Sequence, residues 1–369
     1  MKYYLLAGEA SGDLHGSNLM KALQQTDSQA HFRFFGGDLM QAVGGTLVTH
    51  YKERAFMGFA EVLSNLSKIY KIISDCKKDI EAYNPDVIIF IDNSGFNLRI
   101  AKWAKKNDFR TAYYISPQVW ASRASRIRDI KRDIDAMYVI LPFEKDFYQK
   151  YNYKVNFVGH PLLDAIAGRK QVTEQSLRKH HNLGEKPIIA LLPGSRKQEI
   201  TKMLSVMLTM VPKFTDYQFV IAGAPSQEYD FYEPFIKENN VKFVDNKTYE
   251  LLSISFAALV TSGTATLETA LFKVPQVVCY RAGKISYQIA KRIITLKYIS
   301  LVNLIMDREV VTELIQDDFN SKRLEQELRK ILDDEHRKRM FLDYYELEQK
   351  LGGKGASLKA AKLIYNSLN

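Results

Sequence analysis

The feature that most constrains the fold is a continuous apolar run that ends abruptly in a proline and a glycine. Residues 188–192 read Ile-Ile-Ala-Leu-Leu, Pro193-Gly194-Ser195-Arg196 follows, and a helical pattern begins near Ile200. Such a run is typical of a parallel strand covered on both faces. Gly194 permits a tight turn, and the helix directs free N–H groups and the positive end of its dipole at that turn.

The turn after this strand has the chemistry of an anion site. Arg196 adds a planar, permanently charged guanidinium that suits phosphate oxygens. Together with Gly194, Ser195 and the helix N-terminus, it predicts an anion site whose natural occupant is a diphosphate. An ordinary strand-to-helix turn with a solvent-facing arginine fits the same residues, so both interpretations stay open here.

Strand-like and helical patterns alternate through the chain, which predicts parallel sheets with helices on both faces. The strand-like runs are 3–7, 32–35, 87–91, 111–115, 136–140, 155–158, 188–192, 219–222, 242–244, 258–260 and 276–279. A polar stretch, 168–186, marks a domain boundary. We expect an α/β protein of two doubly wound, Rossmann-like domains, 1–167 and 168–355, that face one another across a cleft. A final helix, 356–369, is expected to pack back on the first domain or on a partner subunit.

Composition narrows the class of protein and of partner. Hydrophobic residues make up 46% and charged residues 25% of the 369 residues, as in soluble globular proteins. The net charge of +10 favours an anionic partner: nucleic acid, an acidic membrane surface or a phosphorylated substrate. The two cysteines form no metal or redox motif, which fits a reducing cytoplasm. No apolar run approaches the about 20 residues that span a bilayer, so we expect a protein that is cytosolic or bound to a membrane from outside.

Ligands of parallel sheets bind beyond the carboxyl ends of the strands. The first such loop, 8–16, contains Glu9, Ser11, Asp13 and His15. Because acids repel phosphate, we expect Glu9 and Asp13 to meet sugar hydroxyls. A helix cap for Asp13 and a solvated loop position for Glu9 also fit.

A second loop, 91–97, carries Asp92 and Asn97 directly after an isoleucine-rich strand. A carboxylate at the end of a buried strand is partly desolvated, and its pKa is raised. That is what a general base for a hydroxyl nucleophile needs. An aspartate that forms a turn with the next two residues is the alternative.

A third loop, 116–120, contains Gln118 and Trp120 and runs into a basic stretch, 123–132. This combination suits nucleic acid, through stacking and charge, or an anionic amphiphile. A solvated helix face is the more common meaning of such a charge run.

The segment 56–73 combines apolar residues, among them Met57 and Phe59, with flanking and interleaved lysines. An apolar face rimmed by lysine is how a helix lies in a membrane interface. An amphipathic helix that packs on the core has the same pattern, and the two are compatible if only part of the face docks on the domain.

In the second half, residues 261–268 open a helix with small hydroxyl residues and a glycine, which predicts another anion-binding N-terminus. Its members Ser262, Gly263, Thr264 and Ala265 are candidate donor-binding residues. Glu268, one turn further, suits a ribose diol or a capping box. Tyr280 and the segment 300–304, with Asn303, end later strands on the same side.

Several of these stretches, taken in order, resemble the lipid A disaccharide synthase family of bacterial glycosyltransferases with the two-domain B-type fold. The matching stretches are 7–13, 56–58 with 61–63, 116–121, 141–144, 158–161, 192–196, 262–268 and 300–304. Each alone is weakly specific, but the ordered set is highly specific and spans about the first 305 residues.

The resemblance implies an inverting transfer of 2,3-diacylglucosamine from its UDP ester to 2,3-diacylglucosamine 1-phosphate. The products are the β-1′,6-linked disaccharide 1-phosphate and UDP. In family terms Asp92 matches the essential aspartate and Arg196 the essential arginine. Glu268 matches the acid near the ribose, and Asn303 a donor-site asparagine.

Two positions depart from the family pattern. The family often has Asp-x-Pro-Asp-Phe-Asn where this chain has residues 92–97 with a single acid, so the role of base falls on Asp92. Ser122 stands where the family usually has a second tryptophan after Trp120, so this position supplies no ring to an aromatic platform.

For the mechanism we expect Asp92 as the base, with Glu9 and His15 as alternatives, and Arg196 with two helix N-termini for the leaving UDP. No Asp-x-Asp pair stands at the diphosphate site, so we expect neither a metal nor another cofactor. Ser11, Asp13, Met57, Phe59, Asn97, Gln118 and Trp120 are expected on the acceptor or membrane side.

The expected partners are the two lipid substrates, the inner face of an acidic membrane and a second copy of the chain, without nucleic acid. The expected location is the cytoplasmic face of the inner membrane. A UDP-sugar 2-epimerase of the same fold and a basic nucleic-acid-binding protein are the rival interpretations; the former acts on the donor alone, and the latter binds oligonucleotides with a steep salt dependence.

Overall fold

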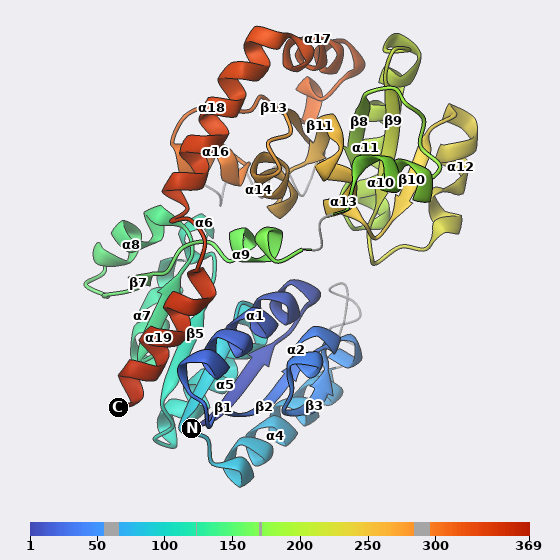
Figure 1. Ribbon diagram of the computed structural model, residues 1–369. Helices are drawn as coiled ribbons and strands as arrows, with labels where there is room; N and C mark the ends of the chain where they lie inside the picture. Colours follow the sequence, from blue (N-terminus) through green and yellow to red (C-terminus); the bar gives the residue numbers. More distant parts are fainter. Residues whose placement is uncertain (55–65, 123, 170–171, 284–295) are drawn as a thin grey trace. The chain divides into compact units, whose positions relative to one another are not determined.

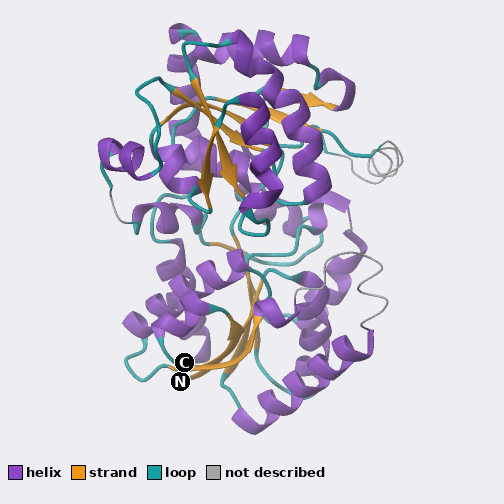
Figure 2. Ribbon diagram, turned by 90° about the vertical axis from the view of Figure 1, so that its right-hand side faces the viewer, coloured by secondary structure: helices purple, strands orange, loops and turns teal. Residues whose placement is uncertain are grey.

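The computed structural model describes residues 1–54, 66–122, 124–169, 172–283 and 296–369. These residues form two compact units: Met1–Gly168 with Leu351–Asn369, and Arg169–Lys350. Each unit contains a parallel sheet flanked by helices (Figure 1 and Figure 2). The two parallel sheets confirm the predicted α/β, Rossmann-like architecture. The observed divisions fall at 168/169 and 350/351, whereas the predicted boundaries fall at 167/168 and 355/356.

The sheet of the first unit has the strand order β3-β2-β1-β4-β5-β6-β7. Its strands are β1 (Lys2–Ala7), β2 (His31–Gly36), β3 (Thr46–His50), β4 (Val87–Ile91), β5 (Thr111–Tyr114), β6 (Ala136–Val139) and β7 (Asn156–Phe157). Its helices are α1 (Ala10–Thr26), α2 (Asp38–Val43), α4 (Leu66–Tyr83), α5 (Ser94–Lys106), α6 (Val119–Ser122), α7 (Ile127–Asp133), α8 (Pro142–Gln149), α9 (Leu162–Ala167) and α19 (Ala356–Leu368).

Two apolar layers cover the faces of this sheet. One contains side chains of α1 and α19, and the other contains those of α4, α5, α7 and α8. The C-terminal helix α19 packs against α1 and buries Ala360, Ala361 and Ile364. The last helix of the chain therefore completes the core of the first unit.

The sheet of the second unit has the order β10-β9-β8-β11-β12-β13. Its strands are β8 (Ile188–Leu192), β9 (Gln218–Gly223), β10 (Lys242–Asp245), β11 (Ser255–Thr261), β12 (Gln276–Tyr280) and β13 (Glu313–Ile315). Its helices are α10 (Glu174–His180), α11 (Lys197–Met207), α12 (Tyr229–Asn239), α13 (Thr248–Ser253), α14 (Thr264–Leu271), α16 (Leu301–Met306), α17 (Ser321–Leu332) and α18 (Asp334–Lys350).

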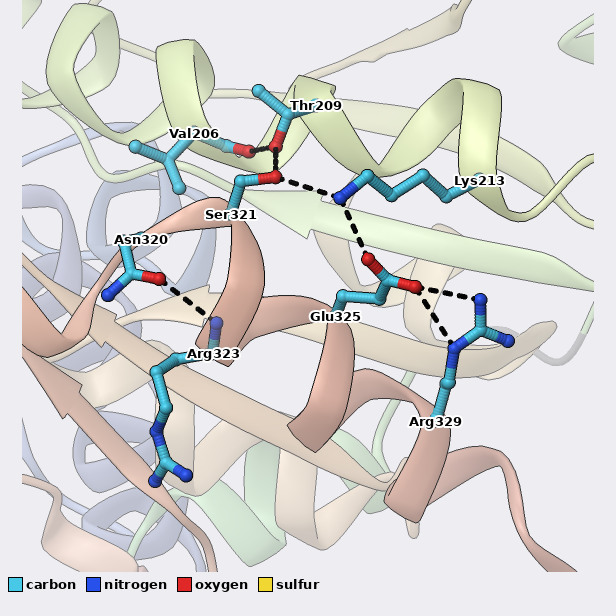
Figure 3. Close-up of polar contacts among 8 residues, drawn as sticks. All are labelled: Val206, Thr209, Lys213, Asn320, Ser321, Arg323, Glu325 and Arg329. Carbon is cyan, nitrogen blue, oxygen red and sulfur yellow. Dashed lines mark hydrogen bonds and ion pairs between the residues drawn. The ribbon is translucent and has the colours of Figure 1, made fainter.

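Polar contacts fasten α17 to the 3-10 turn that follows α11, Leu208–Lys213 (Figure 3). The Thr209 hydroxyl lies 3.0 Å from the Ser321 hydroxyl, and the Lys213 ammonium lies 2.8 Å from the Glu325 carboxylate. Arg329 approaches the same carboxylate from the next turn of α17, at 2.8 Å. These contacts hold the segment that follows the C-terminus of α11, the helix that begins after the Pro-Gly-Ser-Arg turn.

All predicted strand-like runs coincide with strands, and two further strands appear. β3 is a half-exposed edge strand, and β13 has only three residues, so neither produces a long apolar run. The helices in the described part of the chain include none with the length and apolar character needed to cross a bilayer.

Candidate active site

The carboxyl edge of the first sheet brings together two acids. β1 and β4 pair in parallel with Ala7 beside Ile91, so Gly8-Glu9 and Asp92-Asn93 leave the sheet from adjacent positions. A Cβ atom on residue 8 would lie 1.7 Å from the Asn93 side-chain nitrogen, which only glycine avoids. This close approach of the two loops places the charge of Glu9 within reach of Asp92.

The backbone at Asp92 is held in a left-handed conformation. Its φ is +46° and that of Asn93 is +42°, a region that Asp and Asn enter more readily than most residues. The Asp92 carbonyl accepts hydrogen bonds from the Tyr113 hydroxyl and, at 2.8 Å, from Asn97 Nδ2. Neighbouring elements thus fix the backbone, while the side chain stays accessible to solvent.

The protein around the Asp92 carboxyl group partly desolvates it and raises its pKa to about 6. The negative charge of Glu9 raises the pKa further, whereas the N–H of Asn93 lowers it. A carboxylate with a pKa near 6 is ionised at neutral pH and remains basic enough to accept a proton from a hydroxyl group.

Asp13 is engaged by the backbone of another loop. It is 3% exposed, and its carboxylate accepts hydrogen bonds from the N–H groups of Gly37 (2.8 Å), Leu39 (3.0 Å) and Met40 (3.0 Å). Asp13 therefore caps α2, which corresponds to the cap interpretation, although the helix it caps is not its own.

Asn97 is likewise 1% exposed and donates from Nδ2 to the carbonyls of Leu6 (3.2 Å), Ile91 (3.2 Å) and Asp92 (2.8 Å). It holds the ends of β1 and β4 together and fixes the backbone of Asp92 through the Asp92 carbonyl.

The buried side chains of His15 and His160 lie in a polar cluster with the partly exposed Asp164. Burial lowers the pKa of His15 to about 4 and that of His160 to about 3, so both are neutral at pH 7. The Asp164 carboxylate accepts hydrogen bonds from Gly355 (2.6 Å) and Ser357 (2.9 Å) at the start of α19. The cluster therefore lies where α1, α9 and the C-terminal helix meet.

The other predicted acceptor-side residues differ in exposure. Ser11, in the first turn of α1, and Gln118 are exposed, and the Trp120 ring meets Phe143 edge-on with centroids 5.0 Å apart. Met57 and Phe59 lie outside the described residues. In the described part of the amphipathic segment, Ile73 packs into the core while Lys68 and Lys71 face solvent.

The carboxyl edge of the second sheet presents N–H groups and a guanidinium. β8 and β11 pair in parallel with Leu192 beside Val260, so the loops that enter α11 and α14 leave from neighbouring strands. The first N–H groups of each helix have no partner inside the helix. Arg196, the residue before α11, is exposed. The two predicted anion-binding turns thus lie side by side on one edge.

The Pro-Gly-Ser-Arg turn is held from two directions. Gly194 has φ +100°, and a Cβ there would lie 2.2 Å from Glu199 Oε2, which accepts a hydrogen bond from the Ser195 N–H (3.1 Å). The Ser195 carbonyl accepts from the Ser226 hydroxyl (2.7 Å) and from Gln227 Nε2 (3.2 Å). The peptide that carries the Arg196 N–H is therefore fixed in orientation.

The turn at the start of α14 is held in a similar way. Gly263, with φ +155°, precedes the helix, and the Ser262 N–H donates to the Cys279 carbonyl (3.1 Å) of the adjacent strand. Tyr280 is the next residue of that strand. Gly263 and Thr264 are exposed at this edge, and Ala265 is partly exposed.

Glu268 faces Tyr249, whose hydroxyl donates to Oε1 at 2.8 Å. Burial raises the pKa of the Glu268 carboxyl, and this hydrogen bond lowers it in part. The carboxylate retains an oxygen that can accept bonds from a diol.

Comparison with known proteins identifies the family. The model of the family described as lipid-A-disaccharide synthetase matches residues 3–365. A protein of Geobacter metallireducens named lipid-A-disaccharide synthase is 36% identical over 99% of this chain and 96% of its own length. One of Syntrophus aciditrophicus with the same name is 38% identical over 97% and 95%. The chain belongs to the lipid-A-disaccharide synthetase family. It is accordingly a glycosyltransferase of lipid A biosynthesis.

Solved structures agree in fold. The UDP-GlcNAc 2-epimerase of Neisseria meningitidis superposes with a TM-score of 0.67 at 12% identity, over 100% of this chain and 99% of its own. A putative UDP-N-acetylglucosamine 2-epimerase of Listeria monocytogenes gives 0.66 at 12% identity, over 98% and 94%. At this identity the likeness shows the fold alone, which is the predicted B-type glycosyltransferase fold.

The structure gives Asn303, which is expected from the sequence at the donor site, a full set of internal partners. It is completely buried, and Oδ1 accepts from the N–H groups of Val310 (2.8 Å) and Val311 (3.0 Å). Nδ2 donates to the Val311 carbonyl (2.8 Å) and to Glu313 (2.9 Å). All four hydrogen-bonding positions of the amide are occupied.

Two carboxylates that sequence reasoning did not single out as site residues organise the loops of this family member. Glu144 is 1% exposed and accepts from the Ser116 hydroxyl (2.9 Å) and from the N–H groups of Ile140 and Leu141. Burial raises its pKa to about 7. A local signal existed, since Glu144 is the third residue of a helix that starts after Leu141, the position of a capping box. The second, Glu313, has no local signal.

Proposed function

We propose that the chain transfers 2,3-diacylglucosamine from its UDP ester to the 6-hydroxyl of 2,3-diacylglucosamine 1-phosphate, with inversion. The products are the β-1′,6-linked disaccharide 1-phosphate and UDP. Family membership supports the reaction class. The observation that carries the mechanism is the solvent-accessible carboxylate of Asp92, with its raised pKa, at the carboxyl edge of the first sheet.

Asp92 acts as the general base in this proposal. Its carboxylate takes the proton of the acceptor 6-hydroxyl as that oxygen attacks the anomeric carbon of the donor from the face opposite UDP. The bond between the anomeric carbon and the diphosphate oxygen breaks, and its electron pair leaves with UDP. One displacement on one face gives inversion. Glu9 contributes by keeping Asp92 basic, and neither Glu9 nor the buried His15 is needed as the base.

Arg196 and the first N–H groups of α11 and α14 stabilise the leaving diphosphate. A fixed donor directed at developing charge contributes about 3 kcal/mol to the transition state. The fixed Ser195 peptide and the adjacent Ser262–Ala265 turn support this assignment, because the N–H groups are oriented before the ligand arrives. We assign this charge neutralisation to the protein and to no metal or other cofactor.

Glu268 binds the ribose diol in this proposal, with Tyr249 orienting its carboxylate, and Tyr280 lines the donor site. Asn303 belongs to the donor side as a support, since its amide is fully occupied. On the acceptor side, Ser11, Gln118 and Trp120 are available for contacts, whereas Asp13 and Asn97 support the loops from inside.

We also propose that the enzyme works at the cytoplasmic face of the inner membrane, because its substrates carry acyl chains, and that a basic surface on α4 contacts the anionic lipid headgroups. The solvent-facing Lys68 and Lys71 support this location. Charge reversal of both lysines should weaken binding to anionic vesicles. Unchanged vesicle binding would leave α4 as a core helix only. A homodimer remains part of the proposal, testable by light scattering.

The test of the reaction is a transfer assay with radiolabelled UDP-diacylglucosamine, with and without the acceptor. The proposal predicts disaccharide phosphate and UDP only when both substrates are present. Turnover of the donor alone, with a change at its sugar C2, would instead support the epimerase alternative.

A further inference from the structure

The loop that leads into α16 is bound to β13 by one carboxylate. Glu313 accepts hydrogen bonds from the N–H groups of Ile299 (2.9 Å) and Ser300 (2.9 Å), from the Ser300 hydroxyl (2.8 Å) and from Asn303 Nδ2 (2.9 Å). Oε1 accepts three of these bonds and Oε2 accepts the fourth, so four donors surround a group that has about four acceptor positions. Each of these four donors is uncharged, so Glu313 organises a loop, and in the described part of the chain it forms no ion pair.

Asn303 extends this arrangement to the other end of the loop. Its amide oxygen accepts from Val310 and Val311, while its nitrogen holds Glu313. Ser300 and Asn303 are both completely buried. Glu313 and Asn303 thus hold together the two ends of the segment 299–313. We call this pair of residues the Glu313–Asn303 clamp.

Ile299 connects the clamp to the carboxyl edge of the second sheet, where we place the UDP donor. Glu313 holds the N–H of Ile299, and the carbonyl of Ile299 accepts a hydrogen bond from the Ser262 hydroxyl at 2.9 Å. Ser262 immediately precedes Gly263, the residue from which α14 starts. Any displacement of Ile299 therefore changes the position of the turn whose N–H groups face the proposed diphosphate.

We propose that Glu313 is a positioning residue of the donor site, which fixes Ser262 and the N-terminus of α14 through Ile299 and thereby sets the affinity for UDP. The inference rests on the proposed function, because it takes this edge as the UDP site.

A role of Glu313 through its charge and a role through its hydrogen bonds predict opposite effects of Glu313→Gln on UDP binding. If Glu313 acted on the ligand only through its charge, Glu313→Gln would remove a repulsion and tighten UDP binding. As a positioning residue it must accept four bonds, and a glutamine amide would turn its own N–H groups toward those of Ile299 or Ser300. Glu313→Gln should therefore weaken binding.

The experiment is calorimetric titration of the full-length protein with UDP. We expect Glu313→Gln to bind UDP at least about tenfold more weakly, equal to about 1.4 kcal/mol. Glu309→Gln, an exposed glutamate four residues earlier, should stay within about twofold. In turnover assays Glu313→Gln should raise the KM for the donor and leave the KM for the acceptor unchanged.

Ser262→Ala keeps the test decisive even if Glu313→Gln fails to fold, because it removes the same link at its other end. It should weaken UDP binding, and the double variant should bind no more weakly than Glu313→Gln alone. Wild-type-like or tighter UDP binding by folded Glu313→Gln would overturn the inference, as would an unaffected Ser262→Ala. A wild-type protein that did not bind UDP would overturn the proposed donor site itself, and the inference with it.

Discussion

The carboxyl edges of the two sheets use the same strand–loop–helix unit and present opposite charges. At the first edge the carboxylates of Glu9 and Asp92 face solvent. At the second edge Arg196 and helix N–H groups occupy the corresponding place, and the carboxylates of Glu199 and Glu313 are turned back onto loop N–H groups. The placement of the acids thus decides whether an edge offers a base or an anion site.

Each edge also depends on a carboxylate that accepts several backbone hydrogen bonds. Asp13 does this in the first unit and Glu313 in the second. The side chains of Asp13 and Glu313 are used up in hydrogen bonds that stabilise a loop. Asp92 and Arg196 are instead held in place through their backbones, and their side chains remain exposed. The difference separates residues that react from residues that position.

The largest effect is expected for Asp92→Asn. Loss of the base should lower turnover about 10³-fold. Stability should not fall, because a carboxyl group with a folded pKa of about 6 disfavours folding when it is ionised, and asparagine tolerates positive φ. At pH 8 the melting temperature should equal or exceed that of the wild type, and the advantage should shrink as the pH falls below 6. Near-normal turnover, or a clear loss of stability at pH 8, would contradict the division between reacting and positioning residues.

Asp13→Ala should behave in the opposite way. Three N–H groups at the start of α2 would lose their acceptor, which we expect to cost about 3 kcal/mol of unfolding free energy. Asp38→Ala is the matched control, since its side chain is 76% exposed and it should change stability by less than about 1 kcal/mol. Urea denaturation measures both. A stable Asp13→Ala with impaired acceptor binding would return Asp13 to the role of a sugar ligand.

Glu9→Gln should alter the pH profile more than the rate. Because Glu9 raises the pKa of Asp92, its neutralisation should lower that pKa. The acid limb of kcat/KM, expected near pH 6 in the wild type, should then move to lower pH by roughly half a unit, the size of an interaction below about 1 kcal/mol. Glu81→Gln, on the exposed face of α4, should leave the limb in place. An unmoved limb in Glu9→Gln would show that the two edge acids are not coupled.

The smallest effect is expected away from both edges, at the pair of Lys213 and Glu325 in Figure 3. A double-mutant cycle with alanine at both positions should give an interaction of less than about 1 kcal/mol, because both side chains remain partly exposed. Turnover at saturating substrate should be unchanged. A large loss of turnover would mean that the contacts of α17 are needed to keep the carboxyl edge of the second sheet in its active geometry. The local hydrogen bonds of that edge would then be insufficient to do so.

The sequence predicts the sheets and the loops well because both depend on local signals. Apolar runs mark the buried strands, and the residues just beyond them, such as Asp92 and Arg196, necessarily lie at a carboxyl edge. The partners of Asp13, Asn97 and Asn303 are a different matter. Asp13 looks like a ligand in sequence, but its acceptors are filled by N–H groups of residues 37–40, a contact that no local pattern reports.

The carboxylates that support the loops illustrate the same limit. Glu144 stands at a capping-box position, so its hydrogen bond to the Leu141 N–H can be predicted from the sequence. Its hydrogen bond to Ser116 joins the loops that follow two different strands, and no local pattern predicts it. Glu313 reaches residues 299–303, and its strand is too short to be predicted. Positioning residues are difficult to find from sequence because their function is a long-range hydrogen bond.

The most direct measurement compares UDP affinity with turnover in Asp92→Asn and Arg196→Ala. If the first edge supplies the base and the second binds the diphosphate, Asp92→Asn should bind UDP like the wild type while turnover falls about 10³-fold. Arg196→Ala should lose both UDP affinity and turnover. Loss of UDP binding in Asp92→Asn together with normal binding in Arg196→Ala would contradict this division between the two edges.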